Sequence, residues 1–281
     1  MPDPPDAMPM SSAHVTPSHR ALPALLAGLF ALALAACAGG TLPRPAQAHA
    51  WADAEQMIVV TASGWDADHG LLRRFERAPG ADARWTQVGQ AAPVMLGRAG
   101  SAWGLGLHPQ AASGPTKREG DGRAPAGVFA LGTAFGYAER AATRLPYRGM
   151  TASDYCIDVP ASPLYNRIVD ARVVGEAAVA GSTEPMRRDL HANGDPRYRL
   201  GFVIEHNREA RPGAGSCIFA HLTRRAGEPT AGCTAMADAV MDQTLAWLDP
   251  ARRPVFVLLP DAEYRRLQAD WGLPELPGAA R

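Results

Sequence analysis

Residues 216–236 read SCIFAHLTRRAGEPTAGCTAM, and this stretch says more about the fold and chemistry of the chain than any other. An apolar run of β-strand type, 217–220, ends at His221 and is followed by a polar loop that contains glycine and proline. Cys233 comes after this loop and precedes a segment with helical spacing, 236–248. The arrangement is typical of a thiol nucleophile that has an imidazole base beside it.

The thiolate is the reactive form of a cysteine, and a free thiol with a pKa of about 8.5 provides little of it at neutral pH. We expect His221 and the N-terminus of the following helix to stabilise the Cys233 thiolate. Gly232 has no side chain, so the backbone N–H groups of Gly232 and Cys233 are candidate donors to an oxyanion. The alternative is a small buried thiol and a hydrogen-bonded structural histidine. No C-x-x-C motif or second nearby histidine supports a zinc site.

The same segment resembles the active-site signature of the L,D-transpeptidase family (YkuD-type catalytic domain). In that family a histidine precedes a Ser/Thr-x-Gly-Cys motif, matched here by His221 and by T-A-G-C at 230–233. A second element, Pro-x-Gly-x-Phe, appears as PAGVF at 125–129 after a glycine-rich turn. The resemblance covers 57–260. Many members have His where this chain has Ala231 and Arg where it has Ala235.

The resemblance implies a mainly β domain, an L,D-transpeptidase-like barrel or sandwich with a few peripheral α-helices. It also implies that Cys233 attacks a peptide bond between an L- and a D-configured centre in a peptidoglycan stem peptide, forming a thioester. His221 would act as base and acid, oriented by a backbone carbonyl around Leu222. Transfer to an amine would cross-link or remodel the cell wall. Two alternatives stay open: a carboxypeptidase or amidase that uses water, and a non-catalytic lipoprotein that tethers peptidoglycan.

Candidate substrate-binding residues surround this pair in the sequence. Arg224 and Arg225 lie between base and nucleophile, where they could meet a carboxylate, although loop arginines are usually solvated. Thr230 belongs to the motif, and His206 ends an apolar run expected beside the strand that carries His221. For His206, as for His108, a structural role is the alternative. The chain contains no phosphate loop, dinucleotide fingerprint or metal-ligand set, so we expect neither cofactor nor metal.

The N-terminal region has the pattern of an export signal. An apolar run, 21–36, is too short to span a bilayer as a helix and suits a secretory signal. It ends in LAAC, which resembles a bacterial lipoprotein signal, so we predict a signal peptide over 1–36 and lipid on Cys37. A plain signal peptide, cleaved at the A-H-A of 48–50, is the alternative. We expect a flexible tether over 37–52 and a catalytic domain over 53–274, periplasmic and membrane-anchored.

Composition narrows the partners and the redox state. The formal net charge is zero, which gives no support to a nucleic-acid partner or a polybasic membrane surface. The chain has four cysteines, and two of them, Cys156 and Cys217, have no role assigned above. In an oxidising compartment they could form a disulfide, or they could be two separate buried thiols.

The remaining pattern predicts strands joined by turns, then helices. A long insertion with little regular structure is expected over 160–197, where it could form a flap beside the site. A last helix, 262–271, would be N-capped by Asp261. The other predicted helix is 237–248, and the predicted strands are 56–60, 71–77, 83–88, 128–131, 199–206, 217–221 and 254–259.

Overall fold

The computed structural model describes residues 49–80, 83–111, 113–187, 189 and 194–277, all within one compact unit, Gln47–Arg281. The predicted signal peptide and Cys37 lie outside the described residues. In the part of the chain that is described, every helix is too short or too polar to cross a lipid bilayer.

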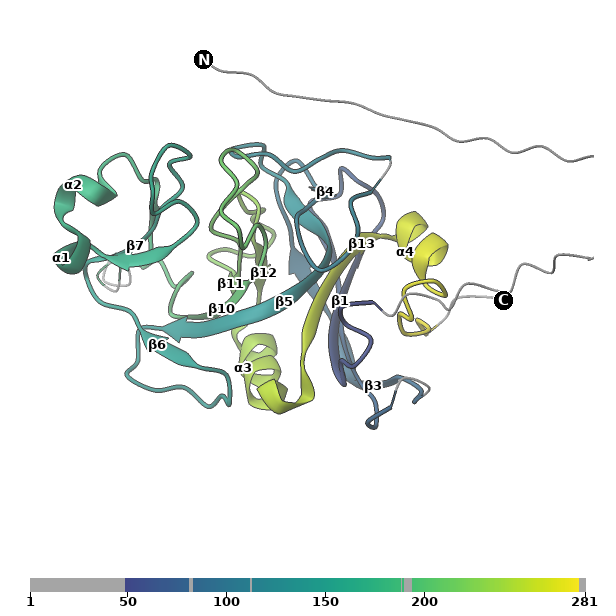
Figure 1. Ribbon diagram of the computed structural model, residues 1–281. Coiled ribbons are helices and arrows are strands. Elements are labelled where there is room, and N and C mark those ends of the chain that lie inside the picture. The colour runs from purple at the N-terminus through teal and green to yellow at the C-terminus, as the bar shows by residue number, and fades with distance from the viewer. Residues whose placement is uncertain (1–48, 81–82, 112, 188, 190–193, 278–281) are drawn as a thin grey trace, which may run out of the picture. The chain divides into compact units, whose positions relative to one another are not determined.

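The domain is mainly β and is built on a barrel-like sheet (Figure 1). Its strands follow the order β10-β11-β12-β3-β2-β1-β13-β5, and β5 pairs back with β10, which closes the path. Two short strands, β4 and β6, also pair with β5. The bounds are β1 Gln56–Ala62, β2 His69–Glu76, β3 Thr86–Met95, β4 Ser101–Trp103, β5 Ala124–Gly136, β6 Tyr147–Gly149, β10 Leu200–Ile204, β11 Phe219–Leu222, β12 Thr234–Met236 and β13 Val255–Pro260.

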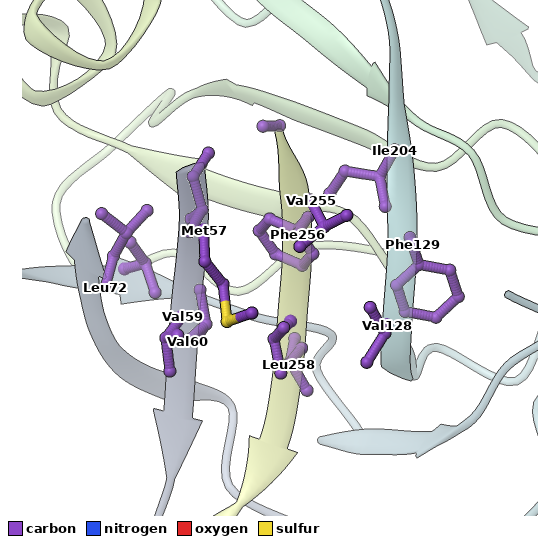
Figure 2. Close-up of a cluster of buried hydrophobic side chains, with 14 of the residues drawn as sticks. Met57, Val59, Val60, Leu72, Val128, Phe129, Ile204, Val255, Phe256 and Leu258 are labelled. Carbon is purple, nitrogen blue, oxygen red and sulfur yellow. The ribbon is translucent and has the colours of Figure 1, made fainter. Parts of the chain in front are cut away.

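The main hydrophobic core lies against β1 and β13, which pair in parallel and are buried along their whole length. Their sequences are nearly continuous apolar runs, as expected of strands covered on both faces. Figure 2 shows Met57 and Val59 of β1 beside Phe256 and Leu258 of β13, with Phe129 of β5 across from them. Fully burying each such side chain stabilises the fold by about 1.5–3 kcal/mol.

A second core lies on the other face of β11 and β12. Ala220 and Leu222 belong to the main core, whereas the alternate residue Phe219 packs in a separate cluster with Cys233 and Phe135. This division follows from the alternation of side chains along a strand. The barrel therefore has an outer apolar face at the segment that carries the candidate nucleophile.

An insertion covers that outer face. It contains a three-stranded sheet, β8-β7-β9, and two short helices, grouped together in Figure 1. A disulfide joins Cys156 of β7 to Cys217, just before β11, so the first of the two cysteine alternatives holds. The prediction of little regular structure over 160–197 is wrong, because this range contains two strands and both short helices. The bounds are β7 Asp154–Cys156, β8 Ile168–Asp170, α1 Ala171–Val174, α2 Glu176–Val179 and β9 Glu184–Pro185.

Two helices flank the barrel, α3 (Asp238–Trp247) and α4 (Asp261–Leu267). The first matches the predicted helix. The second is shorter than predicted, and its N-cap is Pro260, so Asp261 is its first residue rather than its cap. A 3-10 turn, η2 (Pro250–Arg252), precedes β13.

Other boundaries also differ from the prediction: the strands expected at 128–131, 199–206 and 217–221 are β5, β10 and β11, with the bounds given above. The strand expected at 83–88 begins at Thr86 and continues to Met95, where it pairs with β2 and β12. The expected tether also ends too late, because Trp51 is 3% exposed and its indole N–H donates to the Trp271 carbonyl at 3.0 Å. Residues 49–52 therefore belong to the folded domain.

Candidate functional site

The register of two neighbouring strands brings the predicted pair together. Strands β11 and β12 run in parallel, and His221 lies beside Ala235. Cys233 precedes Ala235 by two residues, so its side chain points to the same face as that of Ala235. Strand spacings of about 4.8 Å and about 3.3 Å per residue put the Cα atoms of Cys233 and His221 roughly 8 Å apart. Two side chains can bridge that separation.

Cys233 and His221 line one cavity, with a volume of about 220 Å³. It lies at the outer face of the barrel and receives residues from the insertion, from the segment before β10 and from the loop between β11 and β12. The remaining lining residues are Arg98, Glu184, Arg197, Tyr198, Arg224, Glu228, Pro229, Thr230, Ala231 and Ala235.

A backbone carbonyl orients the imidazole of His221, as the resemblance implied. The Leu222 carbonyl accepts from Nδ1 at 2.8 Å, so Nδ1 carries the proton and Nε2 is left as an acceptor. The Tyr198 ring meets the imidazole edge-on, with 5.7 Å between ring centroids. Burial lowers the pKa of His221 to about 4. His221 is therefore a neutral imidazole at neutral pH, the form required of a general base.

The thiol of Cys233 is neutral as well. It is 7% exposed, accepts from the Phe219 N–H at 3.4 Å and donates to the Cys217 carbonyl at 3.4 Å. Burial, with a smaller effect of the Glu184 charge, raises the pKa of Cys233 to about 12. The expectation of a stabilised Cys233 thiolate is therefore wrong. Strand β12 lies between Cys233 and α3, so the helix N-terminus is not at the sulfur.

Thr230 holds the loop that carries the nucleophile. Its Oγ1 accepts from the Gly232 N–H at 3.0 Å and donates to the Cys233 carbonyl at 2.7 Å. The Gly232 N–H thus already has a partner, which corrects its assignment as a free oxyanion donor. Gly232 is still required by the backbone, because its φ is +154° and a Cβ would lie 2.9 Å from the Arg123 carbonyl oxygen.

Two residues that the sequence analysis missed, Glu184 and Tyr198, lie in the cavity. The Tyr198 hydroxyl donates to Glu184 Oε1, and burial raises the pKa of Glu184 to about 7. Glu184 is on β9, within the weakly patterned insertion, 49 positions before Cys233 in the sequence. No local pattern distinguishes it, since only the folding of the insertion onto the barrel brings it to the site.

The other predicted substrate-binding residues are less favourable. Arg224 lines the cavity but is paired with Glu228, and Arg225 is exposed and outside the lining. His206 lies elsewhere: its Nδ1 accepts from the Leu105 N–H at 3.1 Å, and its Nε2 bonds to the Ala214 carbonyl at 3.0 Å. The structural alternative therefore holds for His206.

His108 also has a structural position. It is buried between aromatic rings, and its Nδ1 accepts from the Val128 N–H at 3.0 Å. It lines a different cavity, together with Gly104 and Asn207.

No protein-family model matches the chain, and the search of curated proteins also gave no match.

Proposed function

We propose that this protein is a cysteine-dependent acyltransferase of the L,D-transpeptidase type that acts on peptidoglycan stem peptides. The observation that carries the proposal is that Cys233 and His221 line one cavity, with His221 Nδ1 bonded to the Leu222 carbonyl. The mainly β barrel with few helices is the architecture that the sequence resemblance implies.

The first half-reaction begins with the neutral pair. His221 Nε2 takes the thiol proton as Cys233 Sγ forms a bond to the carbonyl carbon, so no thiolate has to exist beforehand. The tetrahedral intermediate then breaks its C–N bond, and the imidazolium gives its proton to the departing amine. A thioester remains on Cys233.

The second half-reaction releases the acyl group. An acceptor amine attacks the thioester carbon and His221 takes a proton from it. The C–S bond then breaks, and His221 returns that proton to the departing sulfur, which restores the thiol. Water in place of the amine would give a hydrolase. The acceptor decides between cross-linking and trimming, and the two reactions share every protein group named here.

The proposal is tested by acylation with a carbapenem, read as intact mass. Wild type should gain one adduct, and Cys233→Ala should gain none. His221→Ala, which keeps the thiol, should acylate far more slowly. An adduct on Cys233→Ala, or no adduct on folded wild type, would remove the support for a Cys233 acyl-enzyme. Mass analysis of products from stem peptides then separates cross-linking from hydrolysis.

We also propose that the protein is exported to the periplasm and anchored through lipid on Cys37. The support is the sequence alone: the apolar run 21–36 followed directly by cysteine. Metabolic labelling with a palmitate analogue should mark the wild-type chain but not Cys37→Ala. Equal labelling of both chains would contradict this assignment.

A further inference from the structure

Two cavities meet at the nucleophile. The smaller one, described above, contains His221, and a second, of about 610 Å³, extends along the turn of 117–120 and the insertion. Both are lined by Arg98, Glu184, Ala231 and Cys233. A substrate that reaches across Cys233 would therefore place its two parts in different cavities.

The position of His221 assigns the two parts. In the proposed reaction His221 must give its proton to the departing nitrogen, so the leaving group has to occupy the smaller cavity. Its volume is below the range of about 300–1,000 Å³ typical of pockets for drug-sized ligands, whereas the larger cavity falls within that range. The smaller cavity therefore suits a single amino-acid residue, and the larger one suits the rest of a peptide.

Nearly every charged side chain along these cavities already has a partner. Arg197 forms a two-pronged pair with Asp195, and Arg224 pairs with Glu228. The same holds for Lys117 with Asp121, Glu119 with Tyr165 and Ser216, Asp158 with Thr183, and Glu184 with Tyr198. Among the described residues that line the two cavities, Arg98 is the charged side chain that has no hydrogen bond or ion pair from its guanidinium.

Arg98 is nevertheless held beside the nucleophile. Its backbone N–H donates to the Thr230 carbonyl at 2.8 Å, which ties it to the loop that carries Cys233. Its side chain lies along the backbone of Gly122, where an added Cβ would be 3.1 Å from Arg98 Cζ. The position of the guanidinium thus depends on the absence of a side chain at Gly122.

We propose that Arg98 binds the α-carboxylate of the D-residue that leaves when Cys233 is acylated. A guanidinium presents paired N–H donors that match a carboxylate, and this one is free to receive it. In a terminal residue the carboxylate is separated from the departing nitrogen by one carbon, so both ends fit a cavity for a single residue. This inference rests on the proposed function, and it makes a free terminal carboxylate a requirement for the acyl donor.

The test is a binding measurement that does not need turnover. In the Cys233→Ala protein, calorimetry compares a stem tetrapeptide ending in a D-residue with the same peptide as its C-terminal carboxamide. We expect the carboxylate form to bind about tenfold or more tightly. Adding Arg98→Ala should abolish this preference, and Arg98→Lys should keep part of it. Arg225→Ala, which removes an arginine outside the cavities, should leave the preference unchanged.

The outcomes separate this inference from the proposed function. The role of Arg98 would be overturned by any of three results: the preference for the carboxylate survives Arg98→Ala, Arg98→Ala weakens the binding of both peptides equally, or neither peptide is preferred. If the preference depends on Arg98 but the wild-type protein releases no amine from the peptide, the binding site stands and the proposed reaction is refuted. Matching thermal melts of the variants show that each comparison is made on folded protein.

Discussion

Reduction of the disulfide between Cys156 and Cys217 should destabilise the domain substantially. The two cysteines are 61 positions apart, and closing a loop of that length lowers the entropy of the unfolded chain by an amount worth about 4 kcal/mol at 25 °C. The bond also secures the site, because the Cys217 carbonyl accepts the thiol hydrogen bond of Cys233 and the Cys217 N–H donates to Asn166 Oδ1 at 2.8 Å.

Urea denaturation with and without a non-thiol reductant measures this effect. Cys233→Ala is the background, so that the free thiol cannot exchange with the disulfide. With an m-value of about 3 kcal/mol per M, a loss of about 4 kcal/mol moves the midpoint down by about 1.3 M. The further change Cys156→Ser with Cys217→Ser should give the lower midpoint at once and no response to reductant.

The reasoning fails if reduction exposes two additional thiols, those of Cys156 and Cys217, and the midpoint moves by less than about 0.3 M, which corresponds to about 1 kcal/mol. That result would mean that the insertion is held by its packing alone. The effect of the disulfide on the site itself can be tested by measuring the rate of Cys233 alkylation in the wild-type chain. Alkylation should become faster on reduction, because the carbonyl that accepts the thiol proton of Cys233 is no longer fixed.

Three further predictions concern the site. His221→Ala should slow carbapenem acylation by a factor of about 10²–10⁴, measured by mass spectrometry. In wild type the acylation rate should fall only as the pH approaches the His221 pKa of about 4. Because the pKa of Glu184 is raised to about 7, folded Glu184 binds its proton more tightly than the unfolded chain does. The stabilisation from this proton therefore decreases as the pH rises from about 4.5 to 7. Glu184→Gln should remove this decrease in the free energy of unfolding, measured by urea titration, and an unchanged dependence on pH would refute the assignment. Gly232→Ala should cost about 1–3 kcal/mol, measured by thermal melting, because its Cβ meets the Arg123 carbonyl; Ala231→Gly is the control, and equal effects would count against strain.

Local sequence was sufficient for the strands of the main core and for the first flanking helix. The runs at 56–60 and 254–259 are apolar enough to be buried on both faces, and both are strands in the structure. The helical spacing of 237–248 likewise appears as α3. In these segments the periodicity of the chain and the packing of the fold favour the same conformation, so the local pattern predicts the outcome.

The sequence failed where pairing between distant segments decides the conformation. Residues after Cys233 look like the start of a helix, but Thr234–Met236 form β12 because β11 and β3 supply strand partners on both sides. That pairing removes Cys233 from the helix N-terminus and sets it beside His221 instead. A helix propensity of a few tenths of a kcal/mol per residue is easily overcome by such contacts.

The two chemical groups of the site can be recognised in the local sequence: a cysteine after a glycine in a loop, and a histidine at the end of a strand. Their protonation states and their neighbours, in contrast, depend on tertiary contacts. The insertion buries the site, which disfavours charge and keeps both Cys233 and His221 neutral. It also adds Glu184, while the loop between β3 and β4 adds Arg98. These neighbours are remote in the chain, and they meet because the barrel and its insertion fold around one sulfur atom.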